Sequence, residues 1–135
     1  MVIGFKKQFV PKILDGSKKH TIREDATNRW KVGRVMDMAT GVRTKQYNKF
    51  TEQICLGIQK IEFIWHTENK GLANECRGVK VFIDGRNIND EWFNEDEMLI
   101  DVLARNDGFD NRVDFFTWFS ENFTGKILHW TYLRY

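Results

Sequence analysis

Residues 9–23 read FVPKILDGSKKHTIR, a helical pattern that changes to a strand pattern shortly after a glycine. Apolar residues at helical spacing, followed by Gly16 at a C-cap position, predict a short helix over residues 7–15. The segment after this glycine has the alternation of a β-strand, which places Thr21 and Arg23 on the same face. The stretch therefore predicts a helix, a turn and a strand in succession, with polar side chains on one strand face.

The remainder of the chain carries further strand and helix signals. Period-two alternation predicts strands at residues 2–6, 35–39, 54–65 (with a bulge) and 127–133, and a hairpin over residues 79–87 that turns at Asp84-Gly85. Asn94 and Asp110 carry N-cap signals for two helices, which are predicted to end near Asn106 and Gly125. The polar, basic segment 40–50 predicts a loop or an irregular hairpin.

These elements exclude two common architectures. There are too many strands in the middle of the chain for a helical bundle, and strands do not alternate with helices as a doubly wound sheet requires. Pro11 is the only proline and there is no low-complexity segment, so nothing indicates an interdomain linker. We expect one α+β domain over residues 1–135, a small, partly closed β-barrel of about six strands flanked by two or three helices.

The composition is typical of a soluble globular protein. The chain has 135 residues, of which 41% are hydrophobic and 30% charged, so it can bury a core without disulfides. Its apolar runs are far shorter than the roughly 20 residues that cross a bilayer, and its start lacks a signal-peptide core. The two cysteines lie far apart, and the three histidines lack metal-ligand spacing. We expect a cytoplasmic protein with no membrane span, no metal and no cofactor.

Charge is distributed unevenly along the chain. Residues 1–50 contain 12 basic and 4 acidic side chains, whereas residues 51–135 contain 9 basic and 15 acidic ones. The net charge of +2 therefore conceals a basic N-terminal part and an acidic remainder. A basic cluster is typical of proteins that bind phosphates, which favours RNA or a nucleoside-containing ligand as the partner. The alternative is a dipolar protein whose two parts neutralise each other in space.

Two basic segments contain aromatic side chains that could stack on bases. Arg43 and Lys45 lie close to Tyr47, a mixture typical of proteins that bind single strands, although a solvated loop has the same composition. Trp30 lies between two basic residues and is the preferred stacking candidate. Trp118 lies among phenylalanines on the second predicted helix, so we expect it to be part of the core.

Three segments in the same order resemble the ASCH domain family. In residues 9–23 a helix ending I-L-x-G-x-K runs into a strand ending T-x-R, as at the start of ASCH domains. Residues 103–109, LARNDGF, resemble the family's A-x-x-(E/D)-G-F turn, which an aromatic-rich helix follows. Residues 126–130 are similar to its closing strand. The resemblance implies a PUA-like pseudo-barrel that binds RNA or a modified nucleobase between the first helix–strand junction and the turn Asn106-Asp107-Gly108-Phe109.

The resemblance also implies residue roles. Some small ASCH proteins hydrolyse the acyl amide of N4-acetylcytidine, and their lysine, threonine and glutamate fall on Lys18, Thr21 and Asp107, an aspartate that is one methylene shorter. Thr21 would be the nucleophile and Lys18 the base, if burial or the nearby cations Lys19 and Arg23 lower the pKa of Lys18. Asp107 would orient Lys18 or move a proton, and Arg23 would hold an oxyanion or a phosphate.

The sequence leaves three functions open. The first is recognition of RNA or a modified nucleobase, with the predicted ligand-binding residues Lys19, Arg23, Trp30, Arg43, Lys45 and Tyr47. The second is amide hydrolysis by the Lys18, Thr21 and Asp107 set in the same cleft. The third is a protein-interaction adaptor that uses the acidic segment 84–121. Without the resemblance, Thr21 reads as an ordinary strand residue and Lys18 as an exposed turn lysine.

Overall fold

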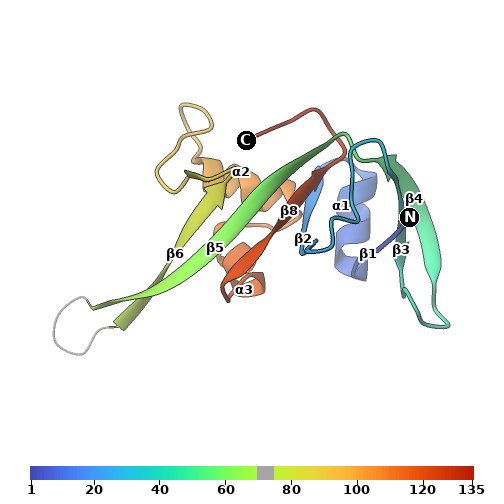
Figure 1. Ribbon diagram of the computed structural model, residues 1–135, viewed down its shortest axis with the longest axis horizontal. Helices are drawn as coiled ribbons and strands as arrows, with labels where there is room; N and C mark the ends of the chain where they lie inside the picture. Colours follow the sequence, from blue (N-terminus) through green and yellow to red (C-terminus); the bar gives the residue numbers. More distant parts are fainter. Residues whose placement is uncertain (70–74) are drawn as a thin grey trace.

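The computed structural model describes residues 1–69 and 75–135, and the side chains of residues 1–67 and 77–135. This part of the chain is an α+β domain with eight strands in two sheets (Figure 1). The strands are β1 (Val2–Gly4), β2 (His20–Arg23), β3 (Val35–Thr40), β4 (Asn48–Ile54), β5 (Gly57–Asn69), β6 (Glu75–Ile83), β7 (Arg86–Asn87) and β8 (Phe123–His129). The helices are the 3₁₀ helix η1 (Lys7–Phe9), α1 (Val10–Leu14), α2 (Leu99–Asn106) and α3 (Arg112–Trp118).

The two sheets have different topologies. The smaller sheet has the order β1-β3-β4, in which β1 is parallel to β3 and β4 is antiparallel to it. The larger sheet has the order β2-β8-β5-β6-β7 and is antiparallel throughout. The predicted α+β class is confirmed. Within the described ranges the strand pairing gives two separate sheets and no closed barrel.

The long strand predicted over residues 54–65 is divided between the two sheets. The Cys55 amide donates to the Arg34 carbonyl beside the small sheet, whereas the Leu56 amide donates to the His129 carbonyl of β8 in the large sheet. The chain therefore changes sheets between two consecutive residues, where the sequence predicts only a bulge. The Arg134 guanidinium covers the Cα of the next residue, Gly57, and a Cβ there would lie 1.9 Å from Arg134 Nη2, so a larger residue would displace this side chain.

Two local predictions about turns are confirmed. Asp84 and Gly85 have φ values of 50° and 80°, as the predicted hairpin turn between β6 and β7 requires. The segment predicted as a loop or irregular hairpin, residues 40–50, joins the antiparallel strands β3 and β4, whose register shifts between Met38 and Ala39.

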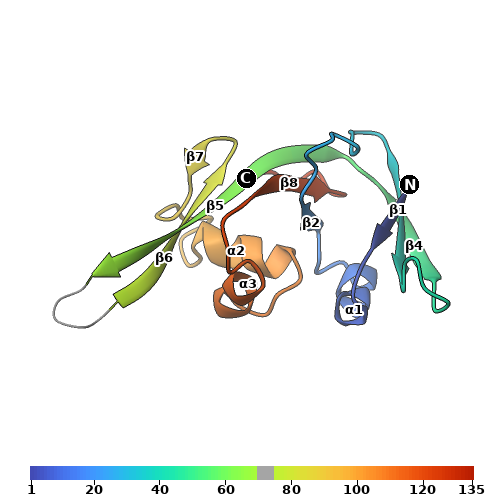
Figure 2. The same cartoon turned by 60° about the horizontal axis from the view of Figure 1, so that its bottom comes forward.

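The end of the β5–β6 pair beyond the β8 pairing projects from the rest of the molecule (Figure 2).

The predicted caps of both helices are wrong in position. The Asn94 side chain accepts from the Glu97 amide at 2.8 Å, yet α2 begins only at Leu99. The cap-like pattern closes a turn instead, because a bridge between Trp92 and Met98 holds the intervening residues outside the helix. At α3 the cap is Asn111, which accepts from the Asp114 amide at 2.9 Å, rather than Asp110. The Asp110 carboxylate is paired with Lys12 of α1.

The hydrophobic core is one cluster that extends from the small sheet to the space between the large sheet and helices α2 and α3. Phe63 of β5 is stacked on Phe119, with ring centroids 5.0 Å apart, and contacts Phe115 edge-on at 5.7 Å. Both views place β2 between α1 and the α2–α3 pair (Figures 1 and 2). The start of β2 is therefore the point at which the N-terminal helix and the C-terminal helices meet.

Candidate functional site

A backbone contact joins the two distant motifs of the sequence. Gly16, with φ of 85°, ends the α1 segment, and the Lys18 amide then donates to the Lys12 carbonyl at 2.9 Å. The next amide, that of Lys19, donates to the Asn106 carbonyl at 2.7 Å. This bond fixes the helix–strand junction against the turn that follows α2. The side chains of the two motifs therefore converge on one place.

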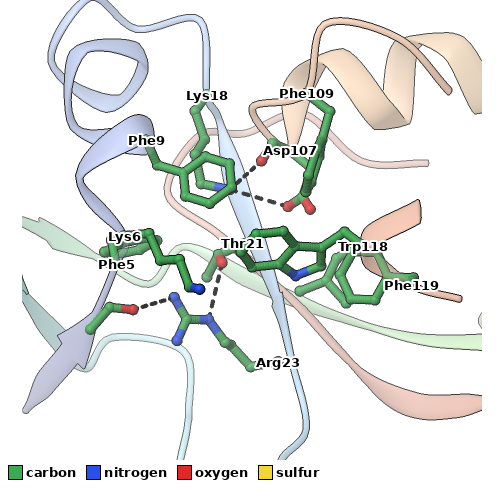
Figure 3. Close-up of a pocket in the computed structure, with 12 residues that line it drawn as sticks. Phe5, Lys6, Phe9, Lys18, Thr21, Arg23, Asp107, Phe109, Trp118 and Phe119 are labelled. Carbon is green, nitrogen blue, oxygen red and sulfur yellow. Dashed lines mark hydrogen bonds and ion pairs between the residues drawn. The ribbon is translucent and has the colours of Figure 1, made fainter. Parts of the chain in front are cut away.

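That place is a cavity of about 340 Å³ (Figure 3). Four of the polar side chains selected from the sequence line it: Lys18, Thr21, Arg23 and Asp107. Aromatic rings form most of its remaining wall, namely those of Phe5, Phe9, Phe109, Trp118 and Phe119. We call this cavity the Lys18 pocket.

Lys18 is buried rather than an exposed turn residue, with 2% of its surface accessible. Its Nζ donates to the Asp107 carbonyl and lies 3.3 Å from Asp107 Oδ1. The same nitrogen lies 5.0 Å from the centre of the Phe9 ring and 5.8 Å from that of Phe5. Burial lowers the pKa of Lys18 to about 8, although the neighbouring Asp107 carboxylate opposes this shift. Lys18 can therefore gain or lose a proton near neutral pH.

The Asp107 oxygen that faces Lys18 is also in contact with His20. His20 Nδ1 lies 3.2 Å from Asp107 Oδ1, and His20 Nε2 lies 2.6 Å from the Tyr135 hydroxyl. That hydroxyl oxygen also accepts from Asn106 Nδ2 at 3.0 Å. These contacts are all satisfied when a neutral His20 donates from Nδ1 and Tyr135 donates to Nε2. Burial lowers the pKa of His20, which favours this neutral form.

Thr21 and Arg23 form the opposite side of the Lys18 pocket. Arg23 Nε donates to Thr21 Oγ1 at 3.1 Å, which confirms that the two side chains share a strand face. Arg23 Nη2 donates to the Gly4 carbonyl at 2.6 Å, and the guanidinium lies 4.7 Å from the centre of the Phe5 ring. A cationic donor on Thr21 Oγ1 favours any negative charge that develops on this oxygen. Figure 3 shows both side chains below Lys18.

Trp118 belongs to the pocket wall instead of the core. It is 45% exposed, and its ring meets those of Phe9 and Phe109 edge-on, at 5.5 Å and 5.7 Å between centroids. Lys6 Nζ lies 5.5 Å from the centre of the same ring. The expectation of a core residue is therefore wrong. Trp118 provides a partly exposed aromatic surface at the pocket entrance.

The other predicted ligand-binding residues lie outside the Lys18 pocket. Lys19 is half-buried, and Trp30 is 4% exposed and packs within the hydrophobic core. Arg43, Lys45 and Tyr47 are exposed in the segment between β3 and β4. Of these five residues, Arg43 and Trp30 border a second cavity next to the pocket.

The sequence interpretation missed His20 and Tyr135 as parts of the site. Strand alternation places His20 on the face opposite Thr21, where an isolated histidine carries no functional signal. Tyr135 lies 115 positions from His20 along the chain, so no local pattern connects them. Phe5 and Phe9 were visible only as apolar residues of the predicted strand and helix.

Neither a metal centre nor a membrane span is found in the part of the chain that is described. No three His, Cys, Asp or Glu side chains there are grouped so that they could hold a metal ion. No helix among those residues is long and apolar enough to cross a membrane. Comparisons with protein-family models, curated proteins and solved structures find no match to this chain.

Proposed function

We propose that the Lys18 pocket binds a nucleobase, and that the protein is an RNA- or modified-nucleobase-binding domain of the ASCH type. The observation that carries this proposal is the aromatic-walled cavity of about 340 Å³ with an ammonium, a carboxylate and a guanidinium at its polar side. Ligand pockets combine apolar walls with a few polar groups that fix orientation. A base offers a flat face for the aromatic rings and donors and acceptors for Lys18, Arg23 and Asp107.

The positions of the family-like segments support the same proposal. The segments 9–23 and 103–109 carry the resemblance, and they are the two that meet at the pocket through the Lys19–Asn106 bond. We further propose that the two sheets correspond to the two parts of a PUA-like pseudo-barrel. The continuous chain through Cys55 and Leu56, which leads from β4 into β5, would join these parts.

Calorimetric titration with cytidine and N4-acetylcytidine tests the binding proposal. Stacking of a base on an aromatic side chain contributes about 1–3 kcal/mol, so Trp118→Ala is expected to weaken binding by that amount. Trp92→Ala is the matched control, because Trp92 is 62% exposed and does not line the pocket. If the two variants bind equally well, or if wild-type protein binds neither compound nor single-stranded RNA, the proposal is wrong.

A second candidate function, amide hydrolysis, is favoured by the lowered pKa of Lys18, which lines the same pocket as Thr21. In this reaction Thr21 Oγ1 attacks the acyl carbon of an N4-acylated cytidine while its proton passes to the neutral Lys18 amine. The carbon–nitrogen bond then breaks, and Lys18 returns the proton to the departing N4 amine. Water hydrolyses the ester on Thr21, which releases the carboxylic acid and restores the hydroxyl. Asp107 holds the Lys18 amine in place, and Arg23, which donates to Thr21 Oγ1, stabilises the negative charge that develops on oxygen during the attack.

Chromatographic detection of cytidine released from N4-acetylcytidine tests this second function. The rate is expected to rise with pH, with its midpoint at about 8, and to level off above it, because the neutral Lys18 amine is the base. Thr21→Ala is expected to abolish release while leaving ligand affinity largely intact, and Thr124→Ala, an exposed threonine of β8, serves as the control. If Thr21→Ala still releases cytidine, Thr21 is not the nucleophile. If the wild-type protein releases none, the hydrolysis proposal is wrong and only the binding proposal remains.

A further inference from the structure

A second cavity, of about 370 Å³, adjoins the Lys18 pocket. Gly4 and Arg23 line both cavities, so Arg23 lies at the boundary between them. Arg29 and Arg43 line the far part of the second cavity, together with one acidic residue, Glu24. Three arginines, from the end of β2, the loop after it and the segment between β3 and β4, therefore line a cavity that has a single acidic residue in its wall.

These guanidinium groups have donors available for a ligand. Arg23 uses Nε on Thr21 and Nη2 on Gly4, whereas its Nη1 has no hydrogen bond to any residue within the described ranges. The side chains of Arg29 and Arg43 make no ion pair or hydrogen bond there either. Forked guanidinium donors match the oxygens of a phosphate, and they bind it more strongly when several converge.

Ordered turns hold the two outer arginines in place. The Arg29 amide donates to Asp25 Oδ1 at 2.8 Å, and Asp25 is itself buried and paired with Lys126. Arg43 has φ of 63° in a turn that Thr44 closes, with its hydroxyl donating to the Gly41 carbonyl at 2.7 Å. The segments that carry the two guanidinium groups are therefore fixed by hydrogen bonds.

We propose that the second cavity binds a phosphate group that is covalently attached to the base in the Lys18 pocket. The ligand would then be a nucleotide, either free or within a strand, and not an unphosphorylated nucleoside. This inference rests on the proposed nucleobase function. The shared Arg23 lines both cavities, and its Nη1 is available to the phosphate while its Nε donates to Thr21 Oγ1.

Calorimetric titration with cytidine, cytidine 5′-monophosphate, cytidine 3′-monophosphate and the dinucleotide CpC tests the proposal. At low salt, wild-type protein is expected to bind at least one phosphate-bearing compound about threefold to tenfold more tightly than cytidine, and added salt is expected to reduce this difference. The double variant Arg29→Gln/Arg43→Asn is expected to lose the difference while retaining its affinity for cytidine. Asparagine tolerates the left-handed conformation of residue 43.

Lys45→Gln is the matched control, because Lys45 is exposed in the same segment as Arg43 but does not line the cavity. A gain with a mononucleotide identifies a free nucleotide, and a gain with CpC alone identifies a strand; both support the phosphate site. Equal affinity for cytidine and all phosphate-bearing compounds overturns the phosphate site but leaves the nucleobase function intact. Equal losses in Lys45→Gln and the double variant also overturn it, because they indicate general electrostatic attraction. Failure of every compound and of RNA to bind overturns both proposals.

Discussion

Lys18 and the exposed segment 41–47 both lie in the basic N-terminal part of the sequence, but their surroundings in the structure differ. In the structure Lys18 is enclosed by aromatic rings and paired with Asp107, whereas Lys45 and Tyr47 are exposed. A buried charge requires a fixed partner, and burial shifts its pKa; an exposed charge is hydrated and screened by salt. The difference between the two regions therefore lies in desolvation rather than in composition.

The largest effect is expected from removing the partner of Lys18. Asp107→Asn leaves the buried ammonium without its carboxylate, which typically destabilises a protein by about 3–5 kcal/mol. Denaturant unfolding of the variant measures this loss. Asp110→Asn is the matched control, since Asp110 pairs with Lys12 at the exposed surface and its removal should change stability little. Similar losses in both variants would show that the Lys18–Asp107 pair has no special role.

A pH dependence follows from the buried histidine His129, which lies beside His20. Burial, followed by the charges of His20 and Arg134, lowers the pKa of His129 from 6.5 to about 3. The unfolded chain therefore binds more protons than the folded one between these pH values, and the folded state loses stability as the pH falls from 6.5 towards 3.

For one histidine this loss is at most about 1.4 kcal/mol per pH unit. His129→Gln removes the titration and keeps a donor for Gln59 Oε1, which accepts from His129 Nε2 at 3.0 Å. The free energy of unfolding of this variant should therefore depend less steeply on pH over the same range. Identical slopes in the wild type and the variant would mean that His129 does not stay neutral in the folded protein.

A smaller loss is expected from Tyr135→Phe. The hydroxyl of Tyr135 donates to His20 and accepts from Asn106, so its removal leaves two buried polar groups without a partner and destabilises the protein by about 1–3 kcal/mol. Tyr132→Phe provides the control, because Tyr132 is 86% exposed. Thermal unfolding should give a lower midpoint temperature for Tyr135→Phe than for Tyr132→Phe. Equal midpoints in the two variants would argue against a hydrogen-bonded chain from Tyr135 to Asp107.

The smallest effects belong to the exposed segment. Lys45→Gln and Tyr47→Ala should each change the free energy of unfolding by less than about 0.5 kcal/mol, because neither side chain is buried. Binding of cytidine should also be unchanged, since neither residue lines the Lys18 pocket. A clear loss of cytidine binding in either variant would move the nucleobase site from the pocket to this segment.

Local patterns in the sequence are sufficient for much of the fold. Period-two alternation correctly predicts strands in the regions of β1, β2, β3 and β5, and the Asp84-Gly85 turn. The last strand is misplaced: the sequence predicts it at residues 127–133 after a helix ending near Gly125, whereas α3 ends at Trp118 and β8 spans Phe123–His129. The division of residues 54–65 between two sheets is not predictable in this way. This division depends on the hydrogen bonds of the Cys55 and Leu56 amides. Their acceptors are the carbonyls of Arg34 and His129, which are distant along the chain.

The candidate site was predictable only in part for the same reason. Spacing alone gives no reason to associate Lys18 with Asp107, and only the resemblance to ASCH domains pairs them. Trp118 has the spacing of a core residue relative to Phe115, but it is the last residue of α3. Its neighbours Phe9 and Lys6 come from the opposite end of the chain, so helical periodicity cannot show that it lines a pocket.

Nuclear magnetic resonance of ¹³Cε-labelled lysine can show whether Lys18 is a buried, ligand-binding amine. The Lys18 signal, assigned with Lys18→Arg, is followed as a function of pH in the absence and presence of cytidine. We expect a pKa of about 8 for Lys18 and a change in that signal when cytidine binds. A pKa near the ordinary lysine value of 10.5, with no response to cytidine or RNA, would contradict a buried, ligand-binding Lys18.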